Sequence, residues 1–246
     1  MRFTSETISD GVAERLFTLG DITGVLWSPA GAADGRPLVL LGHGGGQHKK
    51  APGVVARARR YLTGGFAAAA IDAPGHGDRP RTEQNERFAA DIRRRMAAGQ
   101  PAAPDIARHH AALAARAVSE WQATLDALQA DAGLDGPVGY WGVSMGSAIG
   151  VPLAAAEPRI MAAVFGLAGH ETLAGAAARV TVPVEFLLQW DDELVPRQSG
   201  LALFDAFGSA EKTLHANPGR HGAVPRFEVG SAERFFTRHL GGERLS

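Results

Sequence analysis

Hydrophobic positions along the 246-residue chain follow two spacings. Short apolar runs bounded by turn residues predict β-strands, and longer segments with apolar residues three or four positions apart predict helices. The expected strands are Arg2–Ile8, Arg15–Leu19, Ile22–Trp27, Leu38–Leu41, Ala67–Ile71, Val138–Trp141, Ala162–Gly166, Val184–Gln189 and Lys212–His215. The expected helices lie near Val54–Leu62, Ala112–Ala130, Ser144–Ala156, Gly200–Phe207 and Val224–His239. This order predicts an α/β fold with a mostly parallel central sheet of about eight strands and helices on both faces.

One segment, residues 79–110, interrupts the alternation of strands and helices. Phe88, Ile92 and Met96 recur in it at i, i+4 and i+8, which is the spacing of one apolar helix face. The segment is either a surface helix packed against the domain or a small helical cap over an active site, and its position in the chain favours the cap. Because no repeat or linker divides the chain, residues 1–246 are predicted to form a single domain.

The composition is that of an ordinary globular protein, with 45% hydrophobic and 21% charged residues. A formal net charge of −1 gives no reason to expect a nucleic acid or an anionic membrane as partner. The chain contains no cysteine, which excludes disulfides, thiolate metal sites and a cysteine nucleophile. The N-terminus lacks the apolar core of a signal peptide, and no apolar run approaches 18 residues. These features predict a cytoplasmic protein, and nothing in the sequence indicates its oligomeric state.

A G-x-S-x-G pattern, residues 142–146, lies between the expected strand Val138–Trp141 and an expected helix. This setting is typical of a nucleophile elbow, in which a strained turn exposes a serine hydroxyl. The glycines at −2 and +2 keep side chains away from the backbone that crosses there. Ser144 is therefore the predicted nucleophile. The alternative interpretation is a plain glycine turn with a serine that caps the helix.

A serine hydroxyl needs a base that takes its proton, and His221 is the best candidate among nine histidines. It follows the last expected strand, precedes the final helix, and has glycines on both sides that let the loop turn the ring inward. His43 and His76 lie in glycine-rich loops and are expected to hold those loops by ring hydrogen bonds. His109 and His110 are expected on the surface. No pair of histidines has metal-ligand spacing with carboxylate support, so no metal is predicted.

The base histidine in turn needs an acid that fixes its tautomer. Asp191, Asp192 and Glu193 directly follow an expected strand, at a position where an acidic triplet is hard to explain as part of a core. Asp192 is the first candidate, Asp191 the second and Glu193 the third. The alternative interpretation is an acidic turn that caps the next helix.

A run of glycine and histidine, residues 42–46, follows the expected strand Leu38–Leu41. Glycine loses more backbone freedom on folding than any other residue, so such a run indicates a loop from which side chains are excluded. Residues 42–50 match neither G-x-x-x-x-G-K-[ST] nor G-x-G-x-x-G, which argues against a phosphate- or nucleotide-binding module.

Ser144, Asp192 and His221, in this chain order, resemble the α/β-hydrolase fold family. The resemblance covers nearly the whole chain and includes the HGGG segment (43–46), the DAPGHGD turn (72–78), the nucleophile elbow (142–146) and the D-x-x-V-P acid turn (192–196). The D-x-x-V-P match favours Asp192 over Asp191. Within the family the chain looks most like small carboxylesterases and dienelactone-hydrolase-like members. Dienelactone hydrolases proper use a cysteine nucleophile, which this chain lacks, and this weakens the transfer of their substrate but not of their fold.

The resemblance implies a serine hydrolase that cleaves carboxylic esters of small molecules through an acyl-enzyme and needs no cofactor. It also implies an oxyanion hole, in which preorganised N–H groups stabilise the negative charge on the carbonyl oxygen. The family pattern places one donor on the residue after the nucleophile, here Met145. The second donor is expected in the glycine loop, at Gly45 or, as second choice, Gly44.

Apolar side chains near these residues are expected to line a substrate pocket for an acyl or aryl group of modest size; they are Trp190, Met145, Phe88, Ile92 and Met96. The same triad also serves thioesters, lactones, amides and short peptides, which stay open as alternatives. A small-molecule receptor on this fold is a further alternative, and the complete triad argues against it.

Overall fold

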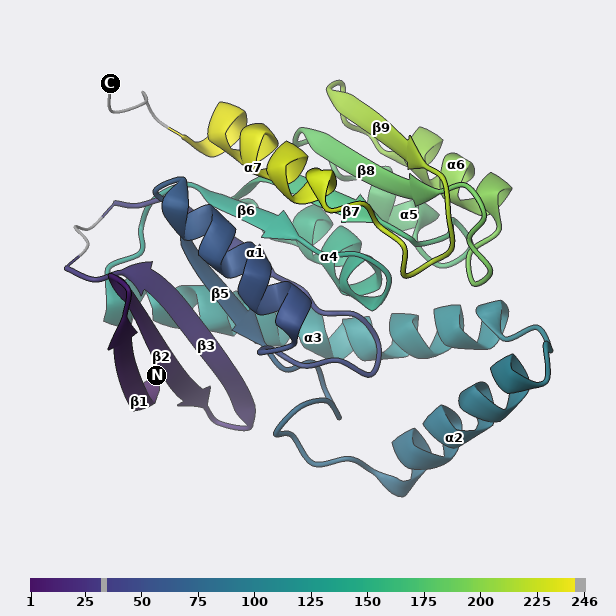
Figure 1. Ribbon diagram of the computed structural model, residues 1–246, viewed down its shortest axis with the longest axis horizontal. Coiled ribbons are helices and arrows are strands. Elements are labelled where there is room, and N and C mark those ends of the chain that lie inside the picture. Colours follow the sequence, from purple (N-terminus) through teal and green to yellow (C-terminus); the bar gives the residue numbers. More distant parts are fainter. Residues whose placement is uncertain (32–34, 242–246) are drawn as a thin grey trace.

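The computed structural model describes residues 1–31 and 35–241, and these form a nine-stranded sheet in the order β1-β2-β3-β5-β4-β6-β7-β8-β9 (Figure 1). The strands are β1 (Arg2–Ser9), β2 (Val12–Leu19), β3 (Ile22–Pro29), β4 (Leu38–Leu41), β5 (Ala67–Ile71), β6 (Val138–Trp141), β7 (Ile160–Gly166), β8 (Val184–Gln189) and β9 (Lys212–Asn217). The first three strands and β5 pair antiparallel, and every pair from β5 to β9 is parallel. The predicted α/β class with a mostly parallel sheet is confirmed.

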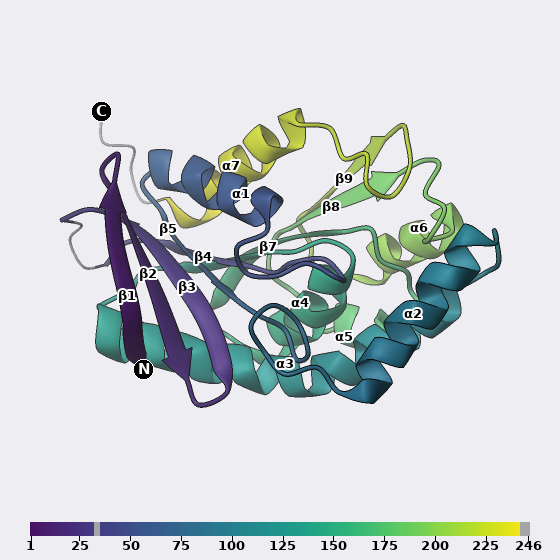
Figure 2. The same cartoon turned by 60° about the horizontal axis from the view of Figure 1, so that its bottom comes forward.

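Helices cover both faces of the sheet (Figures 1 and 2). They are α1 (Pro52–Thr63), α2 (Glu83–Ala97), α3 (Ala103–Ala132), α4 (Met145–Ala156), α5 (Ala174–Ala177), α6 (Arg197–Ala206) and α7 (Phe227–Leu240). α1 and α7 lie together on one face, where the rings of Tyr61 and Phe236 meet edge to face at 5.5 Å. α3, α4, α5 and α6 contribute to the core on the opposite face.

Side chains of successive residues in the central strands point to opposite faces of the sheet, so they belong to two different hydrophobic cores. In β4, Leu38 and Leu40 belong to the core under α3 and α4, whereas Val39 and Leu41 belong to the core under α1 and α7. All four side chains are buried. Burial on both faces explains why this strand reads as a continuous apolar run instead of alternating apolar and polar residues.

The segment 79–110 contains α2 and the first turns of α3, which extend beyond the sheet (Figures 1 and 2). α3 begins at Ala103, earlier than the start near Ala112 that the sequence predicted. Pro104 lies in the first turn of α3, where a backbone N–H has no helical partner to lose, so the helix accommodates it. No helix in residues 1–31 or 35–241 is long and apolar enough to cross a membrane.

Candidate active site

Ser144 lies on the sharp turn between β6 and α4, with φ 57° and ψ −120°. Residues other than glycine rarely adopt a positive φ. Space requires glycine at position 142, where a Cβ would lie 2.9 Å from backbone atoms of Gly146. At Gly146 the fit is looser, because a Cβ there would lie 3.4 Å from the carbonyl group of Gly42. Close backbone approach therefore explains the first glycine of the G-x-S-x-G pattern more strongly than the second.

Two buried side chains fix the turn onto the sheet. Ser147 Oγ accepts a hydrogen bond of 2.8 Å from the N–H of Gly166 at the end of β7, and lies 2.7 Å from the carbonyl oxygen of Gly142. The hydroxyl of Tyr140 donates to the carbonyl oxygen of Gly146 at 2.7 Å. These contacts hold the serine where β6 ends, which is the edge of a parallel sheet at which binding sites form.

His221 and Asp192 complete a chain of hydrogen bonds that begins at Ser144. His221 Nε2 lies 3.0 Å from Ser144 Oγ, and His221 Nδ1 lies 2.8 Å from Asp192 Oδ2. The Asp192 side chain is only 3% exposed. When Nδ1–H donates to the carboxylate, Nε2 is left as an acceptor for the serine hydroxyl. The three residues come from the ends of β6, β8 and β9, so the fold joins positions far apart in the sequence.

The acidic triplet after β8 separates into three distinct roles. The second oxygen of Asp192 accepts hydrogen bonds from the N–H groups of Leu194 and Val195, at 2.8 and 2.9 Å, which orient the carboxylate. Asp191 instead accepts a long hydrogen bond of 3.3 Å from the N–H of Gly219. Glu193 accepts one of 3.0 Å from the backbone N–H of His221. The structure thus joins Asp192 to the imidazole, and the other two acids support the histidine loop.

The glycine loop is anchored by His43, which is buried. The N–H of Ala73 donates to His43 Nε2 at 3.0 Å, and His43 Nδ1 donates to the carbonyl oxygen of Gly44 at 2.9 Å. Burial lowers the pKa of His43 to about 4, so the ring is neutral near pH 7. His76 similarly bonds the carbonyl oxygen of Pro74 at 3.0 Å. Both histidines hold their loops as the sequence predicted.

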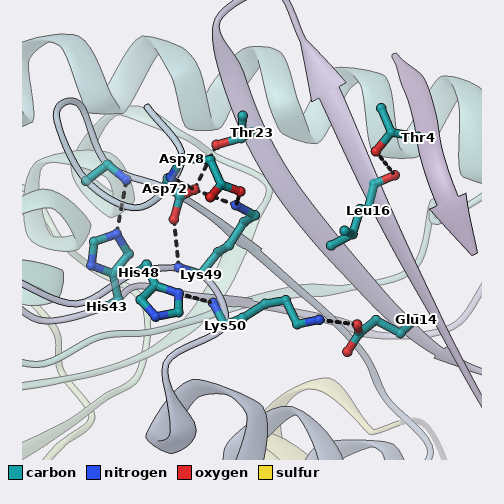
Figure 3. Close-up of polar contacts among 11 residues, drawn as sticks. Thr4, Glu14, Leu16, Thr23, His43, His48, Lys49, Lys50, Asp72 and Asp78 are labelled. Carbon is teal, nitrogen blue, oxygen red and sulfur yellow. Dashed lines mark hydrogen bonds and ion pairs between the residues drawn. The ribbon is translucent and has the colours of Figure 1, made fainter. Parts of the chain in front are cut away.

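An ion cluster in which Lys49 and Asp72 are buried and Asp78 is exposed fastens the same loop to the turn after β5 (Figure 3). Lys49 Nζ lies 2.6 Å from both Asp72 and Asp78, and the Lys49 N–H donates to Asp72 at 2.8 Å. Burial alone would raise the pKa of Asp72, but the hydrogen bonds from Lys49 keep this pKa below its ordinary value. Gly77 has a φ of +56°, and only glycine fits at this position because a Cβ would lie 2.1 Å from the Asp72 carboxylate. The two glycine-rich loops therefore form one rigid unit.

The positions expected to donate to an oxyanion lie on the helix after Ser144 and on the glycine loop. Met145 is the first residue of α4, and the first N–H groups of a helix have no partner within the helix. Gly44 and Gly45 line the same cavity as Ser144 and His221. Gly44 and Gly45, the loop positions named from the sequence, therefore border the same cavity as Ser144.

A comparison with solved structures identifies a similar protein, whereas two other comparisons found none. No protein-family model and no curated protein matches the chain. A solved cold-adapted esterase from an Arctic intertidal metagenomic library, in complex with PEG, is 38% identical over 98% of this chain and 100% of its own, with a TM-score of 0.81. The chain belongs to the α/β-hydrolase fold family.

Within this family the chain groups with the esterases, which confirms the resemblance seen in the sequence. A dienelactone hydrolase from Anabaena variabilis is 21% identical over 92% of this chain and 99% of its own, with a TM-score of 0.64. The ferulic acid-bound Est1E from Butyrivibrio proteoclasticus is 15% identical over 97% and 100%, with a TM-score of 0.68. At these identities the last two share the fold alone.

In this α/β hydrolase two cavities meet at Ser144, Leu167 and His221. The larger, of about 550 Å³, lies between α3 and the loops after β7 and β8. Its lining is mainly apolar and includes Pro101, Ala103, Ile106, Ala107, Leu173, Leu194, Val195 and Pro196. The smaller, of about 280 Å³, lies between the glycine loop and the start of α1.

The pocket residues expected from the sequence lie elsewhere. Trp190 is 44% exposed, and the Arg197 guanidinium lies over its ring at 4.1 Å. Phe88 stacks on His109 with ring centroids 3.9 Å apart, and Met96 is 43% exposed. Neither these residues nor Ile92 line either cavity at Ser144. No residue of α2 is buried, and its ring contact with α3 is the stack of Phe88 on His109, so α3 itself supplies the lining.

His110 corrects a second expectation, because it lines the larger cavity and is half-buried instead of exposed. Its Nε2 lies 3.4 Å from the point where a Cβ of Gly45 would be, so the ring covers the glycine loop. Burial, with the neighbouring His109, His76 and His221, lowers the pKa of His110 to about 4. The lining residues of α3 follow helical spacing; they are Ala103, Ile106, Ala107 and His110. This spacing is the sequence signal that indicates the lining, because it extends the expected helix back from Ala112 to Ala103.

One cluster elsewhere has metal-ligand character. Glu185, His215 and Glu228 come from β8, β9 and α7, and one ligand atom of each lies within 4.8 Å of the others. Sequence spacing cannot reveal such a set. His215 Nδ1 lies 2.8 Å from Glu228, and Nε2 lies 3.8 Å from Glu185, so each ring nitrogen already faces a carboxylate. The absence of a metal stays a prediction.

Proposed function

We propose that this esterase cleaves small to medium carboxylic esters through an acyl-enzyme on Ser144, with His221 as general base and Asp192 as the orienting acid. The hydrogen-bonded chain from Ser144 Oγ through His221 to Asp192 supports this most directly. It lies at the junction of two cavities, where the two halves of an ester have room on either side of the nucleophile.

Acylation begins when His221 Nε2 takes the proton of Ser144 Oγ as the oxygen attacks the ester carbonyl carbon. The carbonyl π electrons move to the carbonyl oxygen, and Asp192 stabilises the imidazolium that forms. When the tetrahedral intermediate collapses, the bond to the leaving alkoxide breaks and the imidazolium gives this oxygen its proton. The alcohol departs and the acyl group stays on Ser144.

Deacylation repeats these steps with water. His221 takes a proton from a water molecule, which attacks the acyl carbon and forms a second tetrahedral intermediate. Collapse breaks the bond to Ser144 Oγ, which recovers its proton from His221. The products are a carboxylic acid and the free enzyme, and no cofactor enters the balance.

In both intermediates the negative oxygen would be held by the N–H groups of Met145 and Gly45, with Gly44 as the second choice for the loop donor. Each such donor contributes about 3–4 kcal/mol to the transition state when judged by its removal. The ties of His43 and Lys49 to the neighbouring turn support this assignment, because a rigid loop needs no reorganisation during the reaction.

The larger cavity favours an apolar acyl or aryl group, since its lining is mostly apolar and its volume of about 550 Å³ matches a small organic ligand. Residues 79–110 contribute Pro101, Ala103, Ile106 and His110 to that lining. The segment is accordingly proposed to act as a cap that shapes the substrate site.

Hydrolysis of p-nitrophenyl acetate by the wild type and by Ser144→Ala tests the proposal. Removal of the nucleophile is expected to lower kcat by about 10⁴-fold or more at unchanged circular dichroism and Tm. Substantial activity in the folded variant would refute the assignment. A matched panel of ester, thioester, lactone and amide substrates then identifies the preferred bond.

A further inference from the structure

The smaller cavity beside Ser144 has a cation in its wall. It is lined by the glycine loop, by His221 and by the first turns of α1, which contribute Arg57. Its volume of about 280 Å³ suits a small group, and its lining is more polar than that of the larger cavity. The two cavities therefore offer different chemistry to the two halves of a substrate.

Arg57 is held rigidly in this wall. Its guanidinium lies over the ring of Trp141, with the Cζ atom 3.7 Å from the ring centroid, and its Nη1 donates to the carbonyl oxygen of Gly53 at 2.9 Å. Arg57 Nε is buried and has no hydrogen-bond partner among the residues that the structure describes. Trp141 is the last residue of β6, three positions before the nucleophile, so the cation is fixed close to the reacting serine.

The charge of Arg57 is not balanced within the described part of the chain. Arg57 forms no ion pair with a carboxylate within 4.0 Å in residues 1–31 and 35–241, and burial lowers its pKa below the ordinary value. The two most deeply buried cationic side chains of these residues are paired, Lys49 with Asp72 at 2.6 Å and Arg79 with Glu120 at 2.5 Å. A partly desolvated cation without a counter-charge is unfavourable, and a bound anion would relieve that cost.

We propose that Arg57 binds a carboxylate of the substrate in the smaller cavity, so that the enzyme prefers esters with one apolar half and one half that carries a carboxylate. This rests on the proposed serine esterase function and extends it to a substrate class. The planar guanidinium matches a carboxylate in geometry as well as in charge. The apolar half would then occupy the larger cavity, and the ester carbonyl would lie between the two, next to Ser144.

Two pairs of substrates test the proposal without assuming which half of the ester carries the anion. The first pair is 4-acetoxybenzoate and its neutral analogue 4-acetoxybenzamide, with the charge on the alcohol side. The second is phenyl hydrogen adipate and its terminal amide, with the charge on the acyl side. For each pair the measured quantity is the ratio of kcat/KM for the acid to kcat/KM for the amide.

The wild type is expected to prefer the acid in at least one pair. Arg57→Met should lower that ratio by about 10- to 100-fold, mainly through KM, because one charge-assisted interaction is lost. Arg57→Lys should retain part of the preference. Arg59→Met is the matched control, since Arg59 is exposed on the same helix and its loss changes the net charge equally. It should leave the ratio as in the wild type.

Three results would overturn the proposal. One is a wild-type ratio of one or less in both pairs. Another is an equal fall for acid and amide in Arg57→Met, which would indicate a role in oxyanion stabilisation or in packing on Trp141. The third is an equal effect of Arg57→Met and Arg59→Met, which would indicate long-range charge alone.

Binding to Ser144→Ala separates this proposal from the proposed function. Calorimetry should show tighter binding of the acid than of the amide to Ser144→Ala, and the difference should vanish when Arg57→Met is added. Equal binding of acid and amide contradicts the carboxylate site even if the wild type hydrolyses both esters. Selective binding without hydrolysis would contradict the esterase mechanism and support the site. Circular dichroism and Tm of each variant report whether it folds.

Discussion

At the scale of single residues, backbone strain is concentrated where the chemistry is expected. Among the described residues, Asp10, Ser144 and Leu167 have positive φ without being glycine. Ser144 and Leu167 both border the two cavities. Such conformations cost about 1–3 kcal/mol each and persist when the surrounding structure enforces them. Here the hydrogen bonds of Ser147 and Tyr140 provide that enforcement.

The acid assignment predicts a contrast between two neighbouring aspartates. Asp192→Asn should lower kcat for p-nitrophenyl acetate by about 10³- to 10⁴-fold, because an amide favours the wrong imidazole tautomer. Asp191→Asn should change kcat only slightly, since Asp191 contacts the N–H of Gly219 and not the ring of His221. The reverse order of damage would show that Asp191 is the acid.

His110 predicts a pH dependence of stability. The pKa of His110 is about 4 in the folded protein, whereas the pKa of a histidine in the unfolded chain has its ordinary value of 6.5. Between these values the unfolded chain binds more protons, so this contribution is complete above pH 6.5 and is lost as the pH falls toward 4. In urea unfolding, the free energy of unfolding should fall between pH 7 and pH 4 in both proteins. The fall should be about 2–3 kcal/mol smaller for His110→Asn than for the wild type.

Exposed His48 supplies the control for that experiment. His48→Asn removes a histidine without emptying a buried site, so its loss of stability on acidification should match that of the wild type. Equal pH dependence in wild type and His110→Asn would contradict the burial of a neutral ring beside the glycine loop.

At the scale of elements, the two glycine-rich loops behave as one unit because Lys49, Asp72 and Asp78 join them. Asp72→Asn should lower the free energy of unfolding by about 2–3 kcal/mol, because the Lys49 ammonium then keeps only the exposed Asp78 as a charged partner. Urea denaturation measures this. The exposed Asp21→Asn is the control, and a loss of under about 1 kcal/mol for Asp72→Asn would contradict the assigned role of the cluster.

The elements also show which features a sequence reveals. All nine expected strands occur, and in the inner strands burial on one or both faces leaves a local apolar signal. Ser144, Asp192 and His221 could be named as candidates because each follows a strand, and the carboxyl ends of parallel strands share one edge. The lining of the larger cavity was missed because it depends on where α3 begins and on how its first turns lie against the loops of the sheet. No local pattern distinguishes the face of Phe88 and Met96, which packs outside the site, from the face of Ile106 and His110.

At the scale of the whole molecule, the larger cavity lies between the segment 79–110 and the loops of the sheet. Ala107→Phe should narrow this cavity from the side of α3. The expected result is that kcat/KM for p-nitrophenyl octanoate falls about tenfold relative to that for the acetate. Arg93→Phe, at an exposed position of α2, is the control. An unchanged chain-length profile would place the acyl group outside this cavity.

Cytoplasmic location stays a prediction.

The central claim is that Ser144 is an activated nucleophile. Intact-mass spectrometry after reaction with a fluorophosphonate probe tests it most directly. The wild type should gain the mass of one adduct, which peptide mapping assigns to Ser144, and Ser144→Ala should gain none. An adduct on another residue, or equal labelling of Ser144→Ala, would contradict the account.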